Sequence, residues 1–112
     1  MLELKDFEAA YNKVQEVVLP TKLIKSEYFS NQTGNDVYLK PENMQLTGAY
    51  KIRGAYYKIS TLSEEEKAKG LITASAGNHA QGVALAAARQ GVKATIVMPT
   101  TTPLLKVNRT KD

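Results

Sequence analysis

The segment 71–98, LITASAGNHAQGVALAAARQGVKATIVM, contains the pattern that decides the fold. It opens with a short apolar run at 71–75 that ends in small residues. The alanine-rich stretch 77–88, bounded by Gly91, predicts a helix that can lie close against a sheet. The continuous apolar run at 94–98 is typical of a buried parallel strand. Strand, helix and strand in this order predict a parallel α/β unit with a right-handed crossover.

The segments on either side of this unit carry helix-start signals. Ser63 and Glu66 have the spacing of a capping box, which predicts a short polar helix that ends at Gly70. Thr102 and Pro103 predict the start of a further helix, as its N-cap and first residue. The C-terminal two-fifths of the chain therefore alternate helix and strand, as an α/β protein does.

The N-terminal half has weaker signals. The spacing of apolar residues predicts an amphipathic helix over 5–18, and the Gly and Asn content of 31–35 predicts a turn. A short strand is expected at 36–40, and a second helix is expected from Thr47 to about residue 59. The apolar face of the first helix consists of Phe7, Ala10, Tyr11, Val14, Val17 and Val18.

Composition excludes several classes of function. The chain has 112 residues, 43% of them hydrophobic and 23% charged, which is ordinary for a globular protein. The absence of Cys and the single His argue against disulfides, a Cys nucleophile and a metal site. A net charge of +4 without a dense basic cluster, and no apolar run of membrane-spanning length, predict neither a nucleic-acid nor a membrane partner. A cytoplasmic location is expected.

The first candidate for chemistry is Lys51, within the motif TGAYKIRGA at 47–55. The expected helix places Lys51 in its first turn, next to the positive end of the helix dipole. That environment favours the neutral amine, which is a nucleophile and a base. Taken alone, the lysine is better explained as a solvent-facing helical residue, because most cationic side chains lie on the surface.

The second candidate is the loop within TASAGNHAQG at 73–82. It lies at the carboxyl end of an expected parallel strand, where α/β proteins bind ligands. Small residues and the free N–H groups of a helix start attract an anion, and Ser75, Asn78 and His79 add polar groups. The alternatives are that Asn78 caps the helix and His79 is a surface imidazole. The loop matches neither a dinucleotide fingerprint nor a Walker motif.

Taken together, the two motifs resemble a known family. TGAYKIRGA followed by SAGNHAQGVA at 75–84 is similar to the fold-type II pyridoxal-phosphate enzymes, in particular the threonine ammonia-lyases. KPENMQLTG at 40–48 and KATIVMPTTTP at 93–103 extend the resemblance over essentially the whole chain. It implies the α/β fold of the tryptophan synthase β-like enzymes, a parallel sheet with flanking helices. It also implies that this chain is an N-terminal part with an incomplete sheet.

The resemblance also implies roles for individual residues. Lys51 matches the lysine that links covalently to the cofactor, pyridoxal 5'-phosphate. Tyr50 occupies the position of an aromatic residue that packs against the cofactor ring, and Asn78 matches the asparagine that hydrogen-bonds its phenolic oxygen. The residues that the resemblance assigns to the substrate carboxylate are Ser75, Gly77, Asn78 and His79.

The implied activity is the conversion of L-threonine to 2-oxobutanoate and ammonia, with L-serine to pyruvate as a second reaction. Serine racemases, which are related, carry a Ser at the position of Ala76 as a second acid and base. Because Ala76 cannot transfer a proton, elimination is favoured over racemisation. The alternatives are a serine racemase-like or other fold-type II enzyme, and a non-catalytic segment. The full-length form is expected to be a homo-oligomer acting on a small amino acid.

The same resemblance predicts a division of the chain. Residues 1–59 are expected to belong to a larger cofactor domain and residues 60–112 to a smaller domain that clamps the substrate. A Gly-rich run for the cofactor phosphate does not occur among the 7 Gly residues. We therefore expect a longer parent protein, and we expect the 112-residue chain to lack activity of its own.

Overall fold

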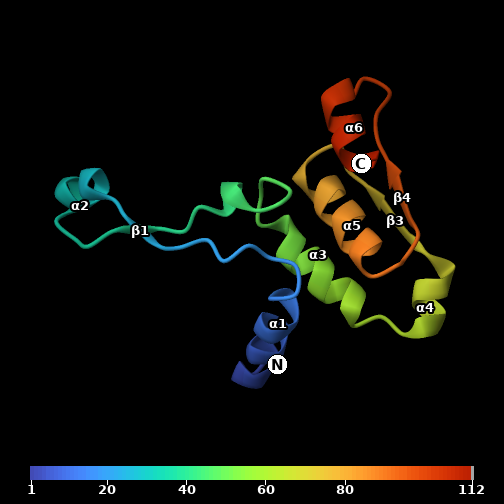
Figure 1. Ribbon diagram of the computed structural model, residues 1–112, viewed down its shortest axis with the longest axis horizontal. Helices are drawn as coiled ribbons and strands as arrows, with labels where there is room; N and C mark the ends of the chain where they lie inside the picture. Colours follow the sequence, from blue (N-terminus) through green and yellow to red (C-terminus); the bar gives the residue numbers. More distant parts are fainter. Residues whose placement is uncertain (112) are drawn as a thin grey trace.

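The computed structural model describes residues 1–111 and combines helices with two small sheets (Figure 1). In chain order the elements are α1 (Leu4–Val14), β1 (Ile24–Lys25), α2 (Glu27–Thr33), β2 (Tyr38–Leu39), the 3-10 helix η1 (Glu42–Met44), α3 (Lys51–Ser60), α4 (Glu64–Lys69), β3 (Leu71–Ala74), α5 (Asn78–Arg89), β4 (Ala94–Val97) and α6 (Leu104–Lys111).

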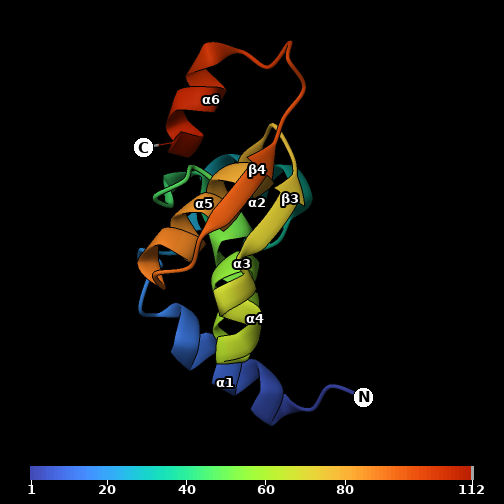
Figure 2. The ribbon, with the colours of Figure 1, turned by 90° about the vertical axis from the view of Figure 1, so that its right-hand side faces the viewer.

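The predicted parallel unit is confirmed. Strands β3 and β4 pair in parallel from Leu71 with Ala94 to Ala74 with Val97, and α5 is the crossover between them. Because α5 covers one face of this pair, alternate residues lie half-buried beneath it and the others are exposed (Figure 2). The run at 94–97 is the parallel strand that the sequence predicts, but within the described residues it is covered on one face only, and Val97 is 50% exposed.

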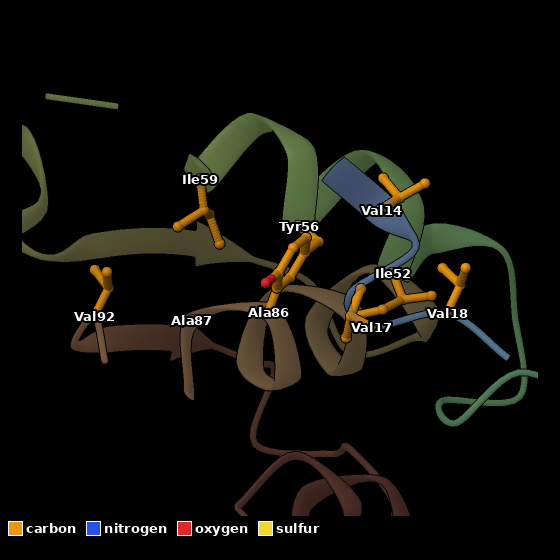
Figure 3. Packing of buried hydrophobic residues seen from close by; sticks show 9 residues of the cluster. All are labelled: Val14, Val17, Val18, Ile52, Tyr56, Ile59, Ala86, Ala87 and Val92. Atoms are coloured by element: carbon orange, nitrogen blue, oxygen red, sulfur yellow. The ribbon is translucent and has the colours of Figure 1, made fainter. Parts of the chain in front are cut away.

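The hydrophobic core lies where α3 meets α5 (Figure 3). Ile52 of α3 and Ala86 of α5 are both completely buried in this core. The alanines bring the two helices close together, since they fill little space between them. The buried cluster consists of Val14, Val17, Val18, Ile52, Tyr56, Ile59, Ala86, Ala87 and Val92.

Helix α1 is shorter than the sequence predicts. It ends at Val14, and the chain turns there, with the Val17 and Val18 backbone N–H groups both donating to the Val14 carbonyl. This turn carries the three valines onto α3, so the C-terminal half of the predicted apolar face is buried. The N-terminal half is not, because Phe7 and Tyr11 remain 60% and 62% exposed.

An arm formed by β1, α2 and β2 projects away from this core (Figure 1). Strands β1 and β2 are antiparallel, and α2 at the tip buries none of its residues. The sequence predicts only a turn at 31–35, whereas the structure has a helix that Ser26 caps and that ends at Gly34. The radius of gyration of 16.8 Å exceeds the ~13 Å expected for a compact domain of 100 residues, which reflects this arm.

The local signals before β3 are confirmed in detail. The Ser63 side chain accepts a hydrogen bond from the Glu66 backbone N–H, and the Glu66 carboxylate accepts one from the Ser63 N–H. This capping box starts α4, and Gly70 ends it in the left-handed region with a φ of 79°. The chain then enters β3 directly, which fixes where that strand begins.

Candidate active site

Lys51 is the first residue of α3. The sequence predicts a helix start at Thr47, but Gly48 adopts a left-handed conformation with a φ of 68°, which a helix cannot continue through. The Thr47 hydroxyl donates to the Ala49 carbonyl rather than capping the helix. Lys51 therefore lies even closer to the positive end of α3 than the sequence predicts.

Side-chain hydrogen bonds at two places hold the loop that precedes Lys51. The Gln45 side chain is 4% exposed, and it both donates to the Leu19 carbonyl (3.0 Å) and accepts from the Leu19 N–H (2.9 Å). The Arg53 guanidinium donates two hydrogen bonds of 2.8 Å to the Glu42 carboxylate. These hydrogen bonds fasten the loop to the chain after α1 and to the first turn of α3. Arg53 and Glu42 therefore form a salt bridge.

The salt bridge between Glu42 and Arg53 makes the free energy of unfolding depend on pH. Hydrogen bonds from Arg53 lower the pKa of Glu42 from 4.5 to about 2. Because the folded pKa is the lower one, the stabilisation is present above pH 4.5 and is lost as the pH falls towards 2. We expect Glu42→Gln to lower the free energy of unfolding by about 1–2 kcal/mol at pH 7 and by less at pH 3. Urea denaturation at the two pH values measures this.

A matched control is Glu65→Gln, which removes an ion pair with Lys69 whose side chains are both at least 70% exposed. Exposed pairs of this kind contribute little, so we expect a change within about 0.5 kcal/mol at either pH. An equal loss of stability for Glu42→Gln at pH 3 and pH 7 would contradict the assignment of the low pKa to Glu42.

The second part of the site is the connection from β3 to α5. The Ser75 N–H donates to the Val97 carbonyl (3.0 Å), and the Ser75 hydroxyl accepts from the Gly77 N–H (3.3 Å). Gly77 is the N-cap of α5 and provides no side-chain cap for its first turn. Asn78 and His79 are the first two helical residues, and both are exposed. The first-turn N–H groups have no acceptor within the helix, so they can bind an anion.

The packing of α5 on α3 brings these two parts together. Gly82 of α5 lies against the backbone of Lys51 and Ile52, and the Gln90 side chain donates to the Tyr56 carbonyl (3.0 Å). The helices therefore run in the same direction, with both N-termini at one end (Figure 1). Asn78 lies four residues before Gly82, on the same face of α5. Gly82 thus lies next to Lys51, and the N-terminus of α5 lies about one turn beyond it.

The other predicted site residues lie at different places around Lys51 and the start of α5. The Tyr50 side chain is exposed, and the Lys51 Nζ lies 5.1 Å from the centre of its ring. His79 follows Asn78 and points about 100° further round the helix. Ser75 and Gly77 form the loop that leads into α5. The sequence does not predict roles for Gln45 or Gly82, although an isolated Gly in an alanine-rich helix is a signal of close packing.

These residues fit pyridoxal phosphate. The amine of Lys51 can form a covalent bond with an aldehyde, and the exposed Asn78 amide can donate to an oxygen. A Cβ placed on Gly77 would meet no atom within 4 Å, so open space lies next to the loop. Within residues 1–111, no group of three or more His, Asp or Glu side chains could hold a metal ion. No helix among the same residues is long and apolar enough to cross a membrane.

Comparison with known proteins identifies the class. A family described as pyridoxal-phosphate dependent enzyme matches residues 14–112. The L-threonine ammonia-lyase of Thermotoga maritima is 53% identical over the whole chain, which spans 28% of that protein. The processed threonine deaminase isoform 2 of Solanum lycopersicum superposes with a TM-score of 0.83 and 42% identity, over 98% of this chain and 32% of that one.

A serine racemase of Dictyostelium discoideum has a TM-score of 0.91 at 34% identity, over 98% of this chain and 36% of that one. Because the family match covers most of the residues, the chain belongs to the pyridoxal-phosphate dependent enzymes. Its fold is that of fold-type II members such as the threonine deaminase and the serine racemase. The chain spans about a third of these relatives.

Proposed function

We propose that the protein to which these residues belong is a pyridoxal-phosphate dependent ammonia-lyase. It converts L-threonine to 2-oxobutanoate and ammonia, and it also converts L-serine to pyruvate. The observation that carries the proposal is Lys51 at the N-terminus of α3, directly beside the first turns of α5. The identity of 53% to an L-threonine ammonia-lyase supports the choice of reaction.

The residues of the chain have distinct tasks in this proposal. When bound, the cofactor supplies an electron sink for the α-carbon of the amino acid. Lys51 holds the cofactor at rest and, once free, its amine takes the α-proton of the substrate. The N–H groups at the start of α5, with Ser75 and Asn78, bind the substrate carboxylate. Tyr50 would supply an aromatic ring beside the cofactor, and the Asn78 amide would donate a hydrogen bond to its phenolic oxygen.

The second candidate is a serine racemase, which the high TM-score of a racemase structure favours. Racemisation needs a second acid on the opposite face of the substrate from Lys51. Ala76, in the loop between β3 and α5, has no group that can transfer a proton. Elimination needs only the removal of the α-proton and the departure of the hydroxyl group. The ammonia-lyase reaction therefore agrees better with the residues present.

Product analysis of the whole protein with pyridoxal phosphate tests the proposal. We expect 2-oxobutanoate from L-threonine and pyruvate from L-serine, with D-serine below a hundredth of the pyruvate. D-Serine as the main product, without 2-oxobutanoate, would establish the racemase instead. Neither reaction with either substrate would refute both.

The 112-residue chain is a useful comparison in the same assay. It contains Lys51 and the loop before α5, but its sequence has no Gly-rich run for the cofactor phosphate. We expect no release of 2-oxobutanoate above the rate with buffer and cofactor alone. Release that Lys51→Ala abolishes would show that the site within these residues is self-contained.

The domain division, the oligomeric state, the location and the kind of substrate belong to the same proposal. Residues 1–59 form part of a larger cofactor domain, and residues 60–112 begin a smaller domain that clamps the substrate. β2 and β3 lie in different sheets, which supports the division, although α3 and α5 pack together across it. The protein acts as a homo-oligomer in the cytoplasm, on free amino acids rather than on nucleic acid or membranes.

A further inference from the structure

Gly82 lies at the closest approach between α5 and the start of α3. A Cβ placed on Gly82 would lie 3.1 Å from the Lys51 carbonyl carbon, 3.2 Å from the Ile52 nitrogen and 3.2 Å from the Lys51 Cβ. Two of these atoms belong to the backbone, and the third is fixed to it. No side-chain rotation can therefore relieve the contact, and the helices must move by a few tenths of an ångström.

The rest of the helix pair limits where this movement can occur. Ala86 lies one turn after Gly82 on the same face of α5, and it is completely buried. The Gln90 side chain ties the far end of α5 to the Tyr56 carbonyl, with an N–O distance of 3.0 Å. Separating the helices along their whole length would open the core around Ile52. The displacement is therefore concentrated at the N-terminal end of α3, where Lys51 lies.

The same face of α5 connects Gly82 with the loop that binds the carboxylate. Asn78 is one turn before Gly82, so a shift of α5 away from Lys51 also moves the start of α5. We call residues 75–77, which lead into α5, the substrate loop. The contact at Gly82 thus fixes the distance between the Lys51 amine and the substrate loop. Reactions of this kind are sensitive to such separations, since a misplacement of 1 Å can cost about 100-fold in rate.

We propose that Gly82 is a positioning residue for Lys51: the absence of its side chain lets the α5 backbone set the distance between the lysine amine and the substrate loop. The proposal rests on the function proposed above for Lys51. It concerns how the amine is held, and Gly82 itself contacts neither substrate nor cofactor.

The test uses the whole protein with Gly82→Ala, and Gly54→Ala as its matched control. Gly54 is an exposed residue of α3, and a Cβ there would meet no atom within 4 Å. Alanine has a higher helix propensity than glycine, so neither change should weaken its own helix. Thermal unfolding of both variants then shows whether a lost activity is due to unfolding or to a local displacement. The first measurement is the rate at which pyridoxal phosphate labels Lys51, with the label reduced by borohydride and located by mass spectrometry. The second is kcat and KM for L-threonine.

We expect Gly82→Ala to fold and to lose at least about 10-fold in both the labelling rate of Lys51 and kcat, with KM within about threefold. Gly54→Ala should match the wild type in all of these. A folded Gly82→Ala protein with labelling and kcat within twofold of wild type overturns the proposal, as does a variant that does not fold. Wild-type protein that labels Lys51 without forming 2-oxobutanoate refutes the proposed function alone, and the labelling rates still test Gly82.

Discussion

Replacing Lys51 by alanine in the whole protein is expected to abolish the release of 2-oxobutanoate, with a loss in kcat of at least about 10⁴-fold. The change removes the only side chain at the start of α3 that can bind an aldehyde covalently. It also removes the base beside the start of α5. The visible absorption of the bound cofactor should disappear together with the activity.

The loss should not come from unfolding, because the Lys51 side chain is half-buried and lies outside the core cluster. Lys58→Ala is the matched control, since Lys58 is an exposed lysine of the same helix. We expect its activity and absorption to stay within twofold of wild type. Unchanged ammonia-lyase activity in Lys51→Ala would refute the assigned role.

Replacing Ile52 by alanine is expected to cause the largest loss of stability. The Ile52 side chain is completely buried where α3 packs against α5. Its replacement by alanine leaves a cavity that the surrounding side chains cannot fill. Substitutions of this kind lower the free energy of unfolding by about 2–5 kcal/mol. Urea denaturation of the chain, followed by circular dichroism, measures the difference from the wild type.

The same substitution at Ile72 is a direct control. Ile72 lies on the outer face of β3 with its side chain 77% exposed, so Ile72→Ala removes the same atoms without opening a cavity. Its effect should stay within about 0.5 kcal/mol. Equal effects at the two positions would show that the core does not lie between α3 and α5.

The parts of the fold that the sequence predicts are those with local causes. Alanine-rich periodicity between two apolar runs predicts the parallel β3–α5–β4 unit, and the spacing of Ser63 and Glu66 predicts the start of α4. The end of α1 at Val14 was not predictable in this way. It depends on the valines packing against α3, which no local pattern describes.

The site residues also differ in whether a local sequence signal predicts them. Lys51 and the loop before α5 have local signals, a helix start and the end of a strand, and their motifs resemble a known family. The roles of Gln45 and Gly82 arise from contacts with residues 26 and 31 positions away in the chain, so only the folded structure reveals them. The start of α3 was misplaced because a left-handed Gly48 outweighs the capping tendency of Thr47.

Covalent mapping of the cofactor shows whether Lys51 is the residue that binds it. The whole protein with pyridoxal phosphate is reduced with borohydride, digested and analysed by mass spectrometry, which locates the reduced pyridoxyl group. We expect one dominant label on Lys51, in stoichiometric yield and lost in Lys51→Ala. A label on Lys40 or Lys58, with Lys51 unmodified, would contradict it.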